Sequence, residues 1–209
     1  MRNIYSQFRI ITPVVLIAYL VTFLSLIAVI IISTSKNIAL DTLTKDPTET
    51  MNAPFYIGAF SNIGIIIWSG AAVLCFFTAM QIKEVTAFRE DYFFLIASAF
   101  ITLMLTTDDL FLIHEEVFPK YFHVPENAVI LTYINIFIIY LILFRNKILS
   151  TEFIILALAF TFIGLAKMSD LIPLPLKKDT FLEDAIKLFG IVSWFIYFFR
   201  FCRQLLQMR

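Results

Sequence analysis

The sequence predicts an all-α fold, a polytopic membrane protein built as a six-helix transmembrane bundle with short loops. Of its 209 residues, 60% are hydrophobic and 24 are Phe, and the mean hydropathy is +0.89. The apolar residues gather in segments close to the ~20 residues that a helix needs to cross the hydrocarbon of a bilayer. Because the connections between these segments are short, residues 1–209 are expected to form a single transmembrane domain.

The expected spans are residues 10–33, 55–80, 92–113, 128–144, 153–172 and 185–199. The first segment follows two arginines like a signal peptide, but its apolar part is too long and no small-residue cleavage site follows it. It is therefore interpreted as a retained first span. The fifth segment is the weakest, because Lys167 and Asp170 interrupt it. A five-span chain, or a re-entrant fifth segment, is the alternative in that region.

The distribution of lysine and arginine predicts the orientation of the spans. The segments on one side, including both termini, hold nine basic and four acidic residues, whereas the other side holds seven basic and twelve acidic residues. Basic residues accumulate on the cytoplasmic side of membrane proteins, so both termini are expected in the cytoplasm. The expected location is the plasma membrane or an inner membrane, in which the protein is multi-pass.

The most polar stretch follows the third apolar segment and contains Asp108, Asp109, His114, Glu115 and Glu116. On a continuous helix, residues seven apart lie about 20° from each other around the axis. Asp108 is therefore expected to stack over Glu115, and Asp109 over Glu116, as two carboxylate columns near the outer membrane face. His114 is expected on a separate face of the same helix, pointing away from both columns.

These five side chains are the candidate metal ligands, because carboxylate oxygens suit a divalent cation and a histidine nitrogen suits a transition metal. An Asp near the apolar core costs about 2.5–3.5 kcal/mol on insertion scales, so Asp108 and Asp109 need a partner or a water-filled cavity. Glu115 and Glu116 are more simply explained as solvated residues in the headgroup region. The expected cofactor is unknown, with a divalent cation as the candidate.

Further polar residues are expected near the same depth on other helices: Lys187, Glu183, Asp184, Asp170, Ser61 and Asn62. Lys187 is expected to neutralise Asp108 or Asp109 across the bundle, so an ion-pair network with no further task is the structural alternative to a cation site. Ser61 and Asn62 are more typical of helix packing within a span, and Asn135 of a hydrogen bond between helices.

One arrangement of residues resembles that of the intramembrane metal hydrolases of the alkaline ceramidase type. Asp108 and His114 lie near one membrane face and Ser61 lies on another span, which implies a lipid-acting hydrolase as one function. That family binds zinc through several histidines, including a close pair on a late helix, and this sequence has no histidine after His123. The chain is therefore not assigned to that family.

The function predicted first is a cation-binding channel or transporter-like protein with an outward-facing acidic site. The alternatives are a non-catalytic membrane subunit or sensor that engages partners, and a membrane-embedded lipid-acting hydrolase. The expected partners are the lipid bilayer and either further copies of the chain or other subunits of a membrane complex. No nucleic-acid binding is expected, and the sequence has neither a Gly-rich phosphate loop nor a GxSxG nucleophile motif.

Overall fold

The computed structural model describes residues 4–45, 47–54, 56–171 and 180–208, and every regular element within them is helical. The expected all-α class is confirmed. Several of these helices are long and apolar enough to cross a membrane. The chain divides into two compact units, Met1–Ile57 and Gly58–Arg209. Each unit is described by itself.

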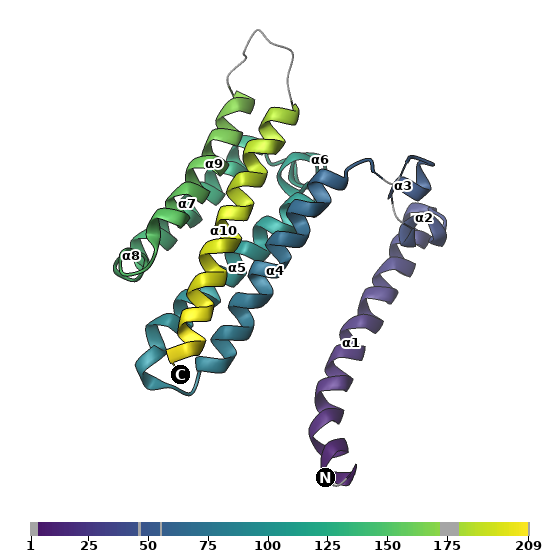
Figure 1. The fold of residues 1–209 in the computed structure, drawn as a ribbon. Helices are drawn as coiled ribbons and strands as arrows, with labels where there is room; N and C mark the ends of the chain where they lie inside the picture. Colours follow the sequence, from purple (N-terminus) through teal and green to yellow (C-terminus); the bar gives the residue numbers. More distant parts are fainter. Residues whose placement is uncertain (1–3, 46, 55, 172–179, 209) are drawn as a thin grey trace. The chain divides into compact units, whose positions relative to one another are not determined.

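The first unit consists of one long helix followed by two short ones (Figure 1). Helix α1 spans Ile4–Lys36, α2 spans Leu40–Thr44 and α3 spans Pro47–Thr50. After α1, Asn37 has a φ of 54°, a left-handed conformation that asparagine tolerates better than most residues and that commonly ends a helix. The segment Val15–Lys36 is apolar and 22 residues long, which is enough to cross a bilayer.

The second unit is a bundle of long helices joined by short helical connections (Figure 1). Its elements in chain order are α4 Ala59–Ile82, η1 Thr86–Phe88, α5 Arg89–Phe111, η2 Ile113–Val117, α6 Phe118–Phe122, α7 Glu126–Leu143, α8 Arg145–Leu149, α9 Phe153–Leu171 and α10 Thr180–Met208. Helix α10 packs against both α9 and α4, and α4 packs against α5. The last helix of the chain is thus central to the unit.

Helix boundaries agree with the sequence expectation in most places. Within the described ranges, five helical segments are long and apolar enough to span a membrane, and a sixth, Phe153–Met168, is apolar but shorter. Helix α10 extends about two and a half turns beyond the expected end at residue 199, to Met208. Helix α5 ends at Phe111, earlier than expected, and this early end reshapes the acidic stretch described below.

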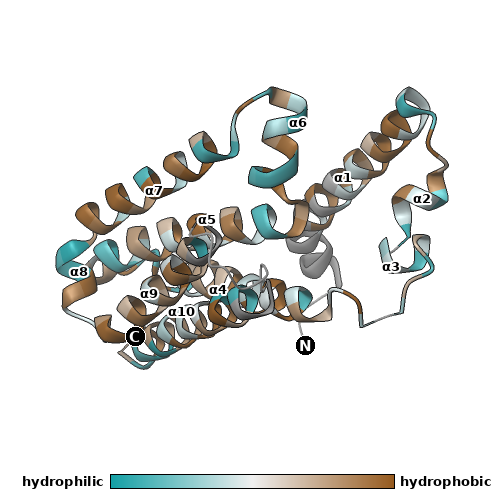
Figure 2. Ribbon diagram, turned by 90° about the horizontal axis from the view of Figure 1, so that it is seen from above, coloured by the Kyte–Doolittle hydropathy of each residue, from teal (hydrophilic) through white to brown (hydrophobic). Residues whose placement is uncertain are grey.

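Large apolar side chains lie on the outside of the second unit as well as in its core. Helix α7 exposes Leu131, Ile134, Ile138 and Ile142, each by 48% or more. In Figure 2, α7 lies at the edge of the view and is mainly hydrophobic along its length. A water-soluble protein rarely exposes apolar surface on this scale, whereas lipid chains solvate it without cost.

The core combines small residues on α4 with aromatic residues on α5 and α10. The buried face of α4 includes Ala71, Cys75 and Ala79, which recur every four residues and are fully inaccessible. Without a hydrophobic driving force between helices in lipid, small residues stabilise association by letting backbones approach closely. Phe94 of α5 is the aromatic centre, with ring contacts at 5.4–6.1 Å to Tyr140, Phe144, Phe198 and Phe201.

The closest approach between helices generates a stability prediction. A Cβ atom added at Gly190 of α10 would lie 2.6 Å from Cγ1 of Ile163 and 3.2 Å from the carbonyl oxygen of Ala159, both on α9. We expect Gly190→Ala to destabilise the protein by about 1–3 kcal/mol, as overpacking does. Gly164→Ala is the control, because a Cβ there meets nothing within 4 Å. Equal melting temperatures for the two variants would contradict the close packing of α9 on α10.

Candidate functional site

The acidic stretch does not continue α5 as a helix. Leu112 adopts a left-handed conformation, with φ 50° and ψ 46°, and residues Ile113–Val117 form a π-helical turn. The amide N–H groups of Glu116 and Val117 both donate to the Leu112 carbonyl, at 2.7 and 3.2 Å. The expected carboxylate columns, Asp108 over Glu115 and Asp109 over Glu116, are therefore wrong, because Leu112 interrupts the α-helix between the two members of each pair.

The same break turns His114 back toward α5. The Nδ1 atom of His114 lies 2.5 Å from Oδ2 of Asp108, and the His114 backbone N–H donates to Oδ1 at 3.0 Å. The expectation that His114 points away from the carboxylates is thus also wrong. The hydroxyl of Tyr133 on α7 donates to Oδ1 of Asp108 at 2.8 Å. Asp108, only 6% exposed, therefore holds the turn and α7 together through three donors, as a buried carboxylate requires.

The proton affinity of His114 follows from this arrangement. The hydrogen bond to Asp108 raises the pKa of the imidazole above its ordinary value, and burial of the ring opposes this rise. The second ring nitrogen, Nε2, lies 3.5 Å from Oε1 of the exposed Glu115. The protonated ring therefore has a carboxylate at each nitrogen, which favours the charged form.

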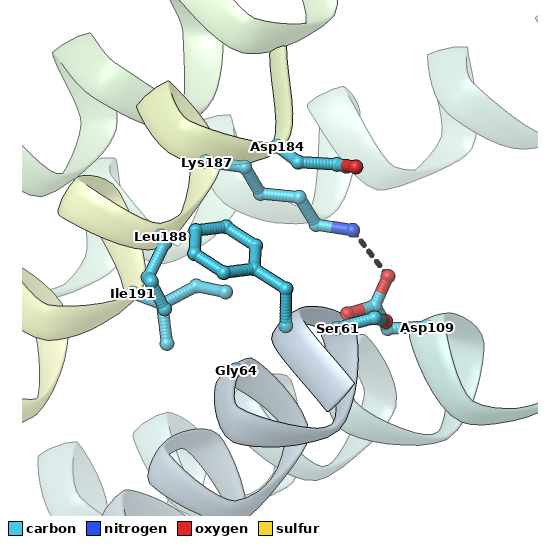
Figure 3. A pocket seen from close by; sticks show the side chains of 8 residues that line it. Ser61, Gly64, Asp109, Asp184, Lys187, Leu188 and Ile191 are labelled. Carbon is cyan, nitrogen blue, oxygen red and sulfur yellow. Dashed lines mark hydrogen bonds and ion pairs between the residues drawn. The ribbon is translucent and has the colours of Figure 1, made fainter. Parts of the chain in front are cut away.

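Asp109 points to another neighbour. Its carboxylate pairs with the ammonium group of Lys187 on α10, so the predicted ion pair across the bundle is confirmed for Asp109. Figure 3 shows the two side chains meeting at the mouth of a small pocket, with the carboxylate of Asp184 beside the lysine. The pocket is lined by Phe60, Ser61, Gly64, Asp109, Asp184, Lys187, Leu188 and Ile191. Two acids and one lysine give it a formal charge of −1.

The remaining candidate site residues bind neither Asp108 nor Asp109 in the described contacts. Glu116 pairs with Lys120, one turn further along the chain. Asn62 is exposed and, unlike its neighbour Ser61, does not line the pocket. Glu183 is half-buried in the first turn of α10. The side chain of Asp170 lies outside the described part of the structure, although its backbone belongs to α9.

The candidate acids thus have separate partners and do not converge on one point. Among the described residues, no group of three or more His, Cys, Asp and Glu side chains is arranged to hold a metal ion. The residues suggested by the hydrolase resemblance also separate, because Ser61 lines the Asp109 pocket while His114 bonds to Asp108. A divalent cation at this end of α5 would have to compete with Lys187 or with the donors on Asp108.

The polar residues of α5 form a continuous face that reaches the opposite end of the helix. Asp91 and Asp109 are 18 residues apart, which is five helical turns and about 27 Å. Asp91 is 4% exposed and pairs with Lys147 of α8. Between the two acids, the hydroxyl of Ser98 lies 2.8 Å from the Tyr140 hydroxyl, and Trp194 Nε1 donates to Thr102 Oγ1 at 2.9 Å.

Sequence reasoning found only part of this face. Ser98 and Thr102 lie eleven and seven residues before Asp109, so helical periodicity places them beneath the acidic stretch, and both are fully buried. Asp91 is one of the four acids that the charge distribution assigns to the cytoplasmic side, and its 18-residue spacing from Asp109 is the signal that places it on this face. Tyr133, Tyr140 and Lys147 were missed, and no spacing within the sequence relates them to α5, because they come from α7 and α8.

The His114–Asp108 pair predicts a specific pH dependence of stability. The pKa of His114 in the folded protein exceeds the unfolded value of about 6.5. The pair therefore contributes its full stabilisation to the folded state below about pH 6.5, and this stabilisation is lost as the pH rises through the folded pKa. We expect the melting-temperature difference between the wild type and His114→Gln to shrink over that window. His123→Gln, in an exposed position, is the control. Wild-type and His114→Gln profiles that stay parallel would contradict the pairing.

Comparison with known proteins places most of both units in one family. The search of curated proteins and the search of solved structures each found no match. A family model, "Domain of unknown function (DUF8692)", matches residues 9–201. The match includes the polar face of α5, the Asp108 and Asp109 centres and Lys187. The chain therefore belongs to the family described as Domain of unknown function (DUF8692).

Proposed function

We propose that this protein is a cation-binding, transporter-like membrane protein whose working element is the polar face of α5. The observation that carries the proposal is the pair of aspartates, the buried Asp91 and the partly buried Asp109, on one helix face at opposite ends of a spanning helix. Each is paired with a lysine from another helix. A charged residue in a membrane span is costly and is typical of ion and proton pathways.

The two ion pairs close the polar face at both ends. Asp109 contacts Lys187 on the outer side, and Asp91 contacts Lys147 on the other. Between them lie hydroxyl groups that can exchange hydrogen-bond partners. Opening either end requires separating one lysine from one carboxylate. A bound cation favours this separation because its positive charge replaces that of the lysine beside the carboxylate. This is the arrangement that alternating access needs, with a barrier at each end and polar groups between.

The outer pocket supports a cation as the ligand. It places the carboxylates of Asp109 and Asp184 and the hydroxyl of Ser61 around one small space, and oxygen ligands suit alkali and alkaline-earth cations. Its negative charge also favours entry of a cation over an anion. Lys187 would then act as a tethered competitor that leaves Asp109 when the cation binds.

We further propose six spans with both termini in the cytoplasm. Helix α9 is 19 residues long, or about 28 Å, which is sufficient to cross the hydrocarbon. With α9 spanning, the nine basic residues of the inner segments lie on one side and the twelve outer acids on the other. This orientation also puts the Asp109 pocket at the outer face and Asp91 at the cytoplasmic one.

Cysteine labelling tests the topology after replacement of Cys75 and Cys202 by Ala. A cysteine at Thr48 or Lys120 is expected to react with an impermeant reagent from outside intact cells, and one at Thr86 or Gln207 only after permeabilisation. Three spans separate Lys120 from Gln207 in the six-span arrangement. Labelling of both these positions from the same side would show that α9 does not cross the membrane.

Flux into liposomes tests the function, with uptake of a monovalent ion, Ca²⁺ and protons measured separately. We expect one of these fluxes in the wild type and a loss of at least about tenfold, equivalent to about 1.4 kcal/mol of barrier, in Asp109→Asn. Because that variant leaves Lys187 unpaired, Asp109→Asn/Lys187→Met is measured beside it. Glu116→Gln, which lies outside the pocket, is the matched control and should keep the wild-type rate.

One observation favours a second function, a non-catalytic membrane subunit or sensor. Ser98, Thr102 and Thr106 all have hydrogen-bond partners within the bundle, so the polar face is closed along its length in this structure. If the wild-type protein transports none of the three ions into liposomes, the transporter proposal is wrong. The polar face would then serve to fix helix packing, and the outer acids would serve a partner.

A further inference from the structure

Helix α7 has two different faces, and only one of them is used within the bundle. Tyr133, Phe137 and Tyr140 point inward, where they contact Asp108, Trp194 and Ser98. The opposite face exposes Asn135. Asn135 lies at the centre of the 18-residue helix, about 13 Å from each end. An amide side chain therefore faces outward at the middle of the membrane.

The hydrogen bonding of Asn135 is incomplete. Its Nδ2 donates to the carbonyl of Leu131 at 2.8 Å. Its other N–H and its Oδ1 oxygen have no partner among the described residues. Lipid chains cannot hydrogen-bond, so an exposed amide in the hydrocarbon keeps an unsatisfied donor and acceptor at considerable cost. This position therefore requires a polar partner from outside the described part of the second unit.

The residues around Asn135 suit close helix packing. Ala128 and Thr132 lie seven and three residues before it, and Ile139 lies four residues after it, on the same side of the helix. Both Ala128 and Thr132 are small and exposed. Small residues next to a polar one let two backbones approach closely enough for an interhelical hydrogen bond. The surface is thus shaped for another helix rather than for lipid alone.

We propose that this surface binds a second copy of the chain, with two α7 helices crossing at Asn135. A primary amide is self-complementary, because its free N–H and its free oxygen match those of an identical amide related by a two-fold axis. One such contact satisfies both residues with two hydrogen bonds. The polar side chains of residues 15–35 of α1 are hydroxyls instead, and Ser25 and Thr34 already donate to carbonyls of their own helix.

Dimerisation is measured by fluorescence resonance energy transfer between labelled full-length chains in liposomes, over a range of protein-to-lipid ratios. Asn135→Leu, which has similar volume and no polar group, is expected to weaken association about tenfold. Asn135→Gln retains the amide and is expected to keep most of the affinity. Thr161→Leu is the matched control, because Thr161 is also exposed on a membrane helix, α9, and should leave association unchanged.

Oxidative cross-linking tests the contact directly in the Cys75→Ala/Cys202→Ala background. Asn135→Cys is expected to give a product of twice the chain mass with copper phenanthroline, and Thr161→Cys is not. A wild type that stays monomeric at every lipid ratio would overturn the proposal, as would an unchanged affinity in Asn135→Leu. Cross-linking of Asn135→Cys to Thr22→Cys within one chain would assign the surface to α1 and would also overturn it.

Discussion

The need to pair buried charge inside an apolar bundle is the constraint on which the second unit depends. Asp91 and Asp109 lie on one face of α5, and each is accessible to only a small extent. An unpaired charge in hydrocarbon is costly. Lys147 and Lys187 supply the opposite charge from α8 and α10. The two pairs therefore fix the register of α5 against its neighbours at both ends of the span.

Polar contacts between those ends hold the same helices in place. The Ser98–Tyr140 and Trp194–Thr102 bonds connect α5 to α7 and to α10. Aromatic packing surrounds them, with Trp194 within 5.5 Å of Phe160 and 5.3 Å of Phe198 between ring centroids. Because lipid and core are equally apolar, such directional contacts decide which helix faces meet, whereas hydrophobicity alone would not.

The helix break at Leu112 is explained by hydrogen bonds to a single residue, Asp108, but it changes the arrangement of the whole acidic stretch. Asp108 accepts hydrogen bonds from the His114 backbone, the His114 ring and Tyr133, and a continuous helix could not deliver the first two to the same carboxylate. The left-handed residue costs conformational energy, of order 1–3 kcal/mol. The three hydrogen bonds to a buried charge compensate for it. The result separates Asp108 and Asp109 into two centres with different partners.

The sequence by itself determined the helical class, the membrane environment, most helix boundaries and a pairing of Lys187 with Asp108 or Asp109. These follow from hydropathy and helical periodicity, which can be read within one segment, and from the cost of unpaired charge. Few charged residues lie within the apolar segments, so few pairings between them are available. Only the tertiary structure decided that α5 breaks at Leu112, that His114 turns onto Asp108, and that Tyr133, Tyr140 and Lys147 complete the polar face. Those contacts depend on helix rotation and depth. Rotation and depth are set by packing between segments far apart in the chain, which local periodicity does not encode.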